Sequence, residues 1–312
     1  MTRYILMRLL SALPTLLGMS FIAFAIVALA PGDPVEQQLR AMGFVPSAED
    51  VAALKAEFGL DKPFLTRYFN WLMRAVQFEF GTSIATGRPV LDEIMIHLPA
   101  TLALAGSALF GAILISLGLG IAAASSGQGV GALVRGLTIM LVSVPSFWLA
   151  LVFIYAFVMV LGWARIVGDG TLGDLVLPAL TLALGSGAAL GRVVYERVRS
   201  EMCEDHIRLA IAKGLSPHRI LSHHIAPRII GPLATAWAST FGGLLGGAVI
   251  VEAIFGWPGL GQLILQAISQ RDFPVIQAYL VFMGLAFFVT SLLADIIVVI
   301  ADPQLRKELH NG

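Results

Sequence analysis

Residues 278–301 read AYLVFMGLAFFVTSLLADIIVVIA, an apolar run in which Asp295 is the one charged side chain. A helix needs roughly 20 mostly apolar residues to cross the hydrocarbon core of a bilayer, which is about 30 Å thick. The run meets this requirement and therefore predicts a transmembrane helix. It is the pattern that decides the fold class.

Five further segments meet the same requirement, near 9–30, 100–124, 137–161, 175–194 and 229–251. The whole chain is 57% hydrophobic and 13% charged, with a mean hydropathy of +0.85, whereas a soluble domain carries about 25% charged residues. We therefore expect an all-α polytopic membrane protein with six transmembrane helices that lie in the lipid bilayer.

Composition also excludes several functions. A formal net charge of zero argues against a nucleic-acid partner, and the single cysteine, Cys203, excludes a disulfide framework or a cysteine-rich metal site. No Gly-Lys pair occurs, so the phosphate-binding loop of ATPases is absent. No G-x-S-x-G or H-E-x-x-H motif occurs either. We expect no catalytic, cofactor-binding or metal-binding residues in this chain, and no enzyme.

The charges of the short loops indicate the topology. With the N-terminus inside, the cytoplasmic stretches collect most of the basic residues, and the short outer loops keep Arg165 and Arg271. Cytoplasmic loops carry an excess of Lys and Arg, so both termini are predicted to be cytoplasmic. Ala28-Leu29-Ala30 has the form of a signal-peptide cleavage site, but the apolar run before it exceeds the roughly 7–15 residues of a signal peptide. We expect it to remain as the first helix.

The spans divide the chain into three parts. Residues 1–30 hold a cytoplasmic N-terminus and the first helix, and residues 31–98 form a periplasmic segment with short helices. Residues 99–312 form a five-helix core with two informative loops. The loop 195–228 is charged and cytoplasmic, and its length suggests that it contacts a partner. The loop 252–277 is periplasmic, and Trp257 with its Gly-Pro neighbours predicts a re-entrant or interfacial turn there.

Several residues within the spans allow two interpretations. Gly242 and Gly246 are spaced for close helix contact, and with Phe147 and Trp148 they could line a path or belong to the core. Asp295 could be structural or part of a proton relay. Four histidines in the cytoplasmic loop (His206, His218, His223 and His224) are interpreted as solvated or subunit-facing residues, not as a metal site.

The cytoplasmic loop has the most specific sequence in the chain. Residues 204–215 read EDHIRLAIAKGL, and His224 and Pro232 follow. This resembles the coupling loop of binding-protein-dependent ABC importer permeases, in the dipeptide, oligopeptide and nickel branch. The resemblance implies that Ala210 and Gly214 are the small positions where two short helices meet. A branched side chain at Gly214 is expected to crowd that turn.

The resemblance covers nearly the whole chain, because further motifs occur in the family's order. They lie at 30–34, 58–63, 80–83, 88–90, 98–101, 144–148, 252–261, 271–274 and 302–303. The fold implied is that of a type I ABC importer permease. In that fold, this subunit pairs with a second homologous permease, and two separate ATPase subunits that use ATP and Mg dock on the cytoplasmic loops. A periplasmic substrate-binding protein delivers the substrate.

The resemblance also implies roles for two groups of residues. Those expected to couple the ATPases are Glu204, Asp205, Arg208, Ala210, Lys213, Gly214, Leu215 and His224. Those expected to face the binding protein are Asp33, Trp257, Arg271 and Asp272.

The substrate is implied less directly. The sequences at 80–83, 88–90 and 255–262 are most similar to nickel and metallophore members, which favours a nickel or metal chelate, with a dipeptide or oligopeptide as the alternative. An ion-coupled secondary transporter, which Asp295 would favour, and a structural membrane protein are the two rival classes.

Overall fold

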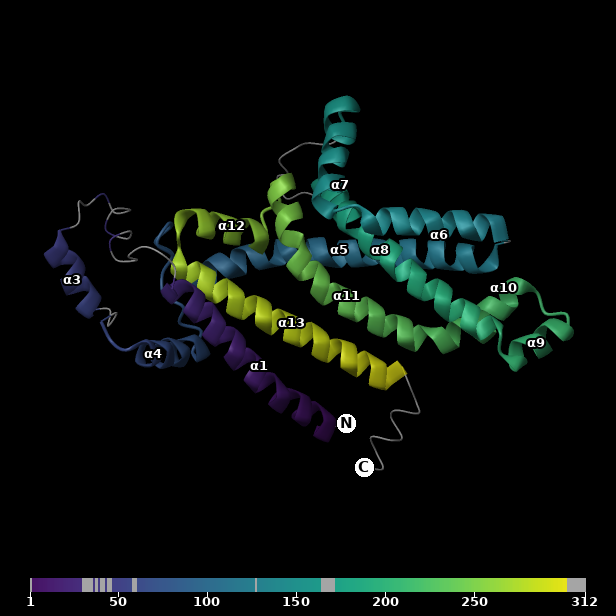
Figure 1. The fold of residues 1–312 in the computed structure, drawn as a ribbon, viewed down its shortest axis with the longest axis horizontal. Coiled ribbons are helices and arrows are strands. Elements are labelled where there is room, and N and C mark those ends of the chain that lie inside the picture. Colours follow the sequence, from purple (N-terminus) through teal and green to yellow (C-terminus); the bar gives the residue numbers. More distant parts are fainter. Residues whose placement is uncertain are drawn as a thin grey trace. The chain divides into compact units, whose positions relative to one another are not determined.

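The computed structural model describes residues 2–29, 36, 39, 43, 47–57, 61–126, 128–163 and 172–301. Figure 1 shows their helices, labelled along the chain. They are α1 (Thr2–Leu29), α3 (Ala48–Glu57), α4 (Phe64–Val76), α5 (Val90–Ser125), α6 (Gln128–Ser143), α7 (Ser146–Phe153), the π-helix η1 (Ile154–Val160), α8 (Leu172–Met202), α9 (Asp205–Ala212), α10 (Pro217–Ile220), the π-helix η2 (Leu221–Ile225), α11 (Ala226–Phe255), α12 (Leu260–Gln270) and α13 (Phe273–Ala301). Within these ranges no β-strand occurs, so the prediction of an all-α chain is confirmed.

Five stretches of the described chain are long and apolar enough to cross a membrane: α1, α5, α8, α11 with the preceding α10 and η2, and α13. A sixth exists if α6 is joined to α7 and η1, which are bent by 96° relative to it. The span predicted near 137–161 is therefore present only as this bent pair. Pro145 stands at the bend as the N-cap of α7, with φ −61° and ψ 138°, because proline lacks an N–H and disfavours helical geometry at Val144 before it.

The chain divides into two compact units. The first contains residues 1–5, 100–258 and 287–312, and the second contains residues 6–99 and 259–286. This grouping differs from the predicted division into 1–30, 31–98 and 99–312, because spatial contacts and not sequence order define it. Residues 259–286 belong with the N-terminal part of the chain.

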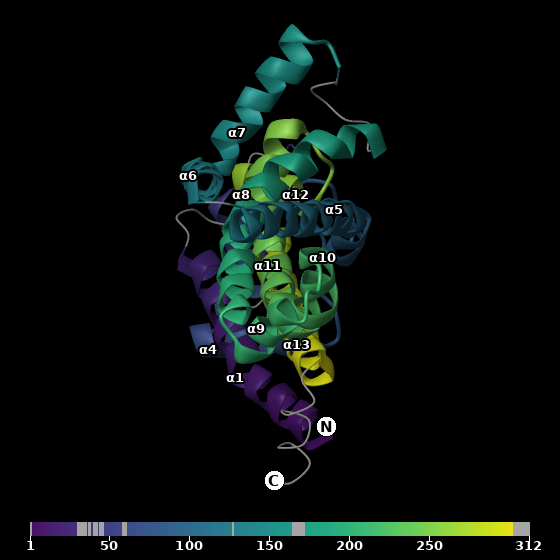
Figure 2. The same cartoon turned by 90° about the vertical axis from the view of Figure 1, so that its right-hand side faces the viewer.

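In the first unit, α8 contacts α6, α7 and α11, and α5 lies beside it in both views (Figures 1 and 2). Glycine permits the approach of α5 to α8. A Cβ added at Gly120 would lie 2.5 Å from Cβ of Val194 and 2.7 Å from the carbonyl oxygen of Gly191. A Cβ at Gly187 would lie 2.8 Å from Cβ of Ile115. Small residues at helix interfaces are the usual means of close packing in membranes.

In the second unit, α4 packs against α1 through aromatic side chains. Phe24, Tyr68 and Trp71 form a buried cluster, and the ring of Tyr68 meets Phe21 and Phe24 at centroid distances of 5.3 and 5.7 Å. The Tyr68 hydroxyl also shares a 2.9 Å hydrogen bond with the Ser20 hydroxyl. The short helices expected between the first two spans are present as α3 and α4.

Candidate functional site: a helical hairpin and an uncharged cavity

The charged loop 195–228 folds into a helical hairpin, made of α9, α10 and η2. The turn after α9 is a Schellman motif. Gly214 N–H bonds to the carbonyl oxygen of Ile211 at 2.9 Å, and Leu215 N–H bonds to that of Ala210 at 3.2 Å. Gly214 has φ +75°, a left-handed conformation that glycine adopts without steric cost.

Gly214 has no atom within 4 Å of an added Cβ. The expectation that a branched side chain would crowd this turn is therefore corrected. The backbone conformation, not the available space, is what restricts residue 214.

One side of the hairpin is fixed to the rest of the first unit. Ile207 and Ala210 of α9 share a buried cluster with Val194 and Val198 of α8 and with further apolar residues of α5, α10, η2 and α11, and Leu215 packs against it. Ala210 is 4% exposed, so a small residue fits where α9 meets this cluster. The hairpin is thus held by the ends of three long helices.

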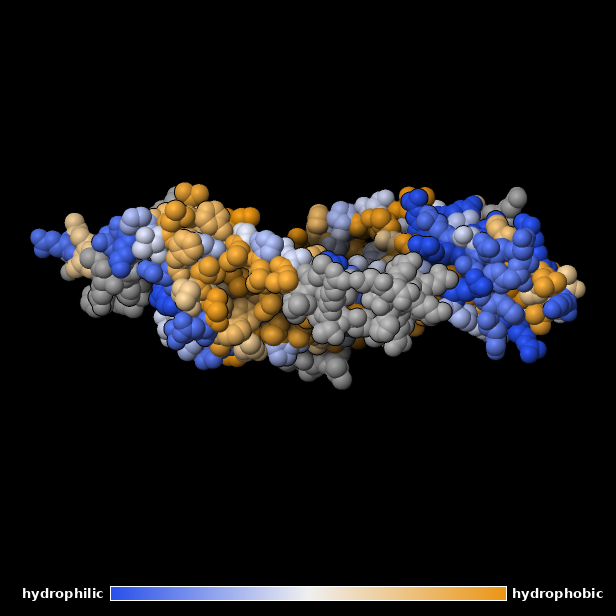
Figure 3. Space-filling view, turned by 90° about the horizontal axis from the view of Figure 1, so that it is seen from below, coloured by the Kyte–Doolittle hydropathy of each residue, from blue (hydrophilic) through white to orange (hydrophobic). Residues whose placement is uncertain are grey.

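The other side of the hairpin is exposed. Leu209 and Ile211 are 56% and 59% exposed, and Glu204 and Lys213 are exposed as well. Asp205 accepts a 3.2 Å hydrogen bond from Arg208, but both side chains are largely in solvent, so the pair adds little stability. In Figure 3, hydrophilic side chains with a few apolar ones among them cover the end where α9 and α10 lie. His224 is partly buried in η2.

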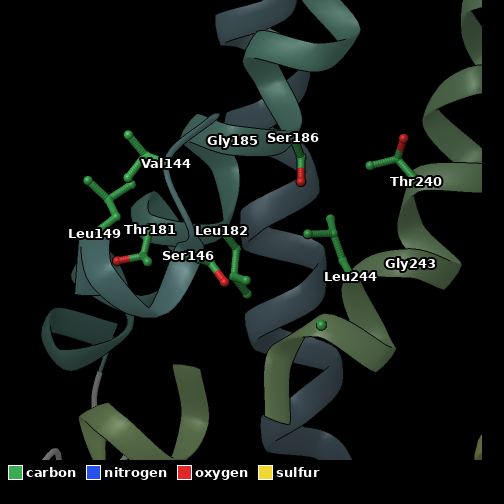
Figure 4. A pocket seen from close by; sticks show the side chains of 11 residues that line it. Val144, Ser146, Leu149, Thr181, Leu182, Gly185, Ser186, Thr240, Gly243 and Leu244 are labelled. Atoms are coloured by element: carbon green, nitrogen blue, oxygen red, sulfur yellow. The ribbon is translucent and has the colours of Figure 1, made fainter. Parts of the chain in front are cut away.

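A cavity of about 320 Å³ opens between α7, α8 and α11 in the first unit (Figure 4). Its lining is uncharged and mostly apolar, with four hydroxyl side chains. It consists of Val144, Ser146, Leu149, Thr181, Leu182, Gly185, Ser186, Thr240, Gly243, Leu244 and Gly247. The Thr181 and Thr240 hydroxyls donate to the carbonyl oxygens of Leu177 and Ala236, both at 2.8 Å. Their lone pairs leave them able to accept a further hydrogen bond from a guest molecule.

The residues that the sequence offered as path or packing residues lie outside this lining. Gly242 is buried, and an added Cβ would lie 3.0 Å from the Thr290 hydroxyl, so it lies at the contact of α11 with α13. Gly246 is exposed with open space around it. Phe147 and Trp148 are 47% and 53% exposed.

None of the four predicted path or packing residues lines the cavity. One pattern in the sequence does indicate the cavity: Thr240, Gly243 and Gly247 recur at helical spacing in α11. These positions share one face of the helix.

Buried polar contacts join two motifs in the first unit. The Thr101 hydroxyl donates a 2.7 Å hydrogen bond to the carboxylate of Glu252, which is 0% exposed. The indole N–H of Trp257 donates to the carbonyl oxygen of Ala100 at 2.8 Å. Helix α5 is in this way tied at Ala100 and Thr101 to the end of α11, where Gly256 closes the helix at φ +62°.

A similar junction occurs in the second unit. The Ser83 hydroxyl donates a hydrogen bond to the carboxylate of Asp272, and the Ala85 N–H donates to the same oxygen at 3.2 Å. Four residues after Ser83, Gly87 has φ +70°. Arg88 and Thr86 both contact Glu93, at 3.0 and 2.7 Å. The loop between α4 and α5 is therefore held at both sides by buried carboxylates.

These junctions correct part of the sequence interpretation. Trp257 is 4% exposed and Asp272 is 1% exposed, so neither side chain presents a surface to a binding protein. Both are used inside the chain because a buried N–H or carboxylate needs a hydrogen-bond partner. Arg271 is exposed, at φ +54°. Asp33 lies outside the described residues.

Further ionisable residues lie in α13 and near the hairpin. Asp295 lies in α13 and is partly buried. Nε2 of His206 lies 3.9 Å from a carboxylate oxygen of Glu201. Across the described ranges, no group of three or more His, Cys, Asp and Glu side chains is arranged to hold a metal ion.

The described helices form an all-α fold with five or six candidate membrane spans. A chain of the MetNI methionine ABC transporter, solved in an inward-facing conformation, superposes with a TM-score of 0.59 at 20% identity. The match covers 67% of this chain and 96% of that one. The shared fold confirms the predicted type I ABC importer permease architecture.

The chain belongs to the family described as the binding-protein-dependent transport system inner membrane component, whose sequence model matches residues 115–307. A second model, for the N-terminal part of such membrane components, matches residues 1–105. A permease protein of Brucella abortus (strain 2308) that is named for a peptide transport system is 36% identical over 99% of this chain and 100% of its own length. The glutathione transport system permease protein GsiC of Salmonella typhimurium (strain LT2) is 33% identical over 98% and 99%.

Proposed function

We propose that this chain is the membrane-spanning subunit of an ATP-driven importer of small peptides and forms half of its translocation path. The family membership supports the transporter class, and the relatives named for peptide and glutathione transport support the substrate. The sequence had favoured nickel or metal chelates. A peptide substrate agrees with the names of these relatives at least as well as a metal chelate does. The uncharged cavity also offers four hydroxyl side chains in a mostly apolar lining.

The hairpin of α9, α10 and η2 is the proposed docking site for an ATPase subunit. Its inner side is fixed by apolar packing, and its outer side exposes Leu209 and Ile211 beside charged groups. Exposed apolar residues with a charged rim are typical of protein interfaces. Because the inner side is fixed, a displacement of the hairpin would be transmitted to α8 and α11.

The complete importer then contains a second homologous permease, two ATPase subunits that bind ATP and Mg, and a periplasmic substrate-binding protein. Both termini and the hairpin face the cytoplasm in this arrangement. The ATP-binding loop absent from this chain is supplied by the ATPase subunits.

Co-purification from the native membrane tests the assembly. We expect a tagged chain to bring a second permease and ATPase subunits, with vanadate-sensitive ATPase activity. Leu209→Asp should reduce the retained ATPase subunits, whereas Glu196→Ala, an exposed change on α8, should not. A chain that purifies without ATPases, with uptake that depends on a proton gradient, would contradict the proposal and point to Asp295.

Uptake measurements test the substrate. Vesicles that contain the complex and its binding protein should accumulate a labelled dipeptide or glutathione when ATP is supplied. Uptake of a nickel chelate with no uptake of peptides would overturn the peptide assignment and leave the importer class intact.

A further inference from the structure

The helix α4 combines three faces in 13 residues. One face packs on α1 through Tyr68 and Trp71. The neighbouring face is apolar and exposed, and it contains Leu65, Phe69, Met73 and Val76, which are 58%, 59%, 64% and 69% exposed. The third face is polar and contains Thr66, Arg67, Asn70 and Arg74. No carboxylate occurs in this helix.

The contacts of α4 with α1 show where along α1 it lies. α1 contains a candidate membrane span from Leu10 to Leu29. Phe64 and Tyr68 meet the rings of Phe21 and Phe24. At 1.5 Å per helical residue, Phe24 and Phe21 lie about 8 and 12 Å from the Leu29 end. These contacts differ from the prediction that residues 31–98 lie wholly in the periplasm.

We infer that α4 lies in the membrane, in the leaflet that α1 reaches at Leu29, with phospholipid covering its exposed apolar face. An amphipathic helix that lies in the interface buries its apolar face about 5–10 Å into the headgroup and acyl boundary, which matches the contacts with α1. α1 also exposes apolar side chains along its candidate span, among them Ile22 and Ile26. In Figure 3, apolar side chains gather where α4 and the described part of α1 lie.

The polar face fits the headgroups of that leaflet. Arg67 lies 6.0 Å from the centroid of the Phe24 ring, and its buried Nε has no hydrogen-bond partner among the described residues. Arg74 lies seven residues later, on the same side of the helix. A long cationic side chain at this depth extends toward the interface, where it meets the phosphate of an anionic phospholipid.

Spin labels on adjacent faces of α4 test the position of the helix. Cysteines replace Phe69 or Asn70 in a chain whose own cysteine is changed by Cys203→Ser, and the labelled chain is reconstituted with its partner subunits in nanodiscs of phosphatidylglycerol and phosphatidylcholine. Oxygen partitions into the bilayer and a nickel chelate into water. We expect the label at Phe69 to collide mainly with oxygen, as a label at Ile22 does, and the label at Asn70 mainly with the chelate.

Two outcomes overturn the inference. Access of the chelate to both Phe69 and Asn70 would place α4 in water. Exclusion of both reagents from Phe69 would mean that a protein, such as the binding protein or the second permease, covers this face.

Retention of lipid tests the two arginines separately. The double variant Arg67→Gln/Arg74→Gln should retain fewer phosphatidylglycerol molecules than the parent complex in native mass spectrometry. Arg192→Gln, which removes an exposed cation from α8 outside the hairpin, should retain as many as the parent. Equal retention by all three complexes would overturn the headgroup assignment. The inference rests on α1 spanning the membrane. It does not depend on the substrate, so a failure to take up peptides would leave it unaffected.

Discussion

Ser83 and Asp272 are 189 residues apart in sequence, yet the Ser83 hydroxyl donates a hydrogen bond to the buried carboxylate of Asp272. This contact joins the loop before α5 to the residue before α13, within one compact unit. Each residue belongs to a short motif with no obvious chemistry of its own. Together they fix the path of the chain outside the long helices.

We expect Ser83→Ala to destabilise this unit. A hydrogen bond to a charged group contributes about 1.5–3 kcal/mol, and the variant leaves the buried carboxylate with one donor fewer. The thermal midpoint of the complex in nanodiscs should fall. Thr82→Ala, a change at an exposed neighbour, is the control and should leave the midpoint unchanged. Equal midpoints for Ser83→Ala and the parent would show that the contact adds no stability.

Gly214→Val should impair transport through the conformation of the backbone. The left-handed backbone conformation raises the free energy of a residue with a side chain by roughly 1–2 kcal/mol. The increase is larger for a β-branched residue such as valine. Gly214→Asn is the matched control, because asparagine tolerates this conformation and the space beyond Cβ is open. We expect Val to reduce ATP-dependent peptide uptake and Asn to leave most of it. Loss of uptake in both variants would point to steric crowding by a docked subunit.

Gly243→Leu should block the proposed path without disturbing the fold. An added Cβ at Gly243 meets no atom within 4 Å, so the leucine side chain enters the cavity that this glycine lines. Gly246→Leu, at an equally open position outside the lining, is the control. We expect peptide uptake to fall for Gly243→Leu alone, with assembly and ATPase activity retained. Normal uptake by this variant would remove the cavity from the path.

Gly120→Ala should weaken the contact of α5 with α8. The new methyl group would lie 2.5 Å from Cβ of Val194, and overpacking of this kind costs about 1–3 kcal/mol. Gly118→Ala, on the same helix with open space around it, is the control. A lower thermal midpoint is expected for Gly120→Ala only. A fall of the same size in both variants would indicate that helix α5 itself, and not its packing, is affected.

The sequence by itself determined the fold class and the family. Long apolar runs such as 278–301 predict spans because a bilayer leaves the backbone few alternatives to a helix. The resemblance of residues 204–215 to the family's coupling loop implied two short helices that meet near Gly214, a residue type that often ends a helix. These features depend on neighbours in sequence and could be read without coordinates.

Only the tertiary structure decided which residues meet across the fold. In the structure, Ser83 contacts Asp272 and Thr101 contacts Glu252. Trp257 is buried, and the span 137–161 bends at Pro145. Gly243 lines the cavity, whereas its sequence neighbour Gly242 lies at the contact with α13. Which side of a helix faces a neighbour or a cavity depends on packing between distant segments. A membrane helix with apolar residues on all sides carries only a weak periodic signal of that choice, such as the spacing of Thr240, Gly243 and Gly247.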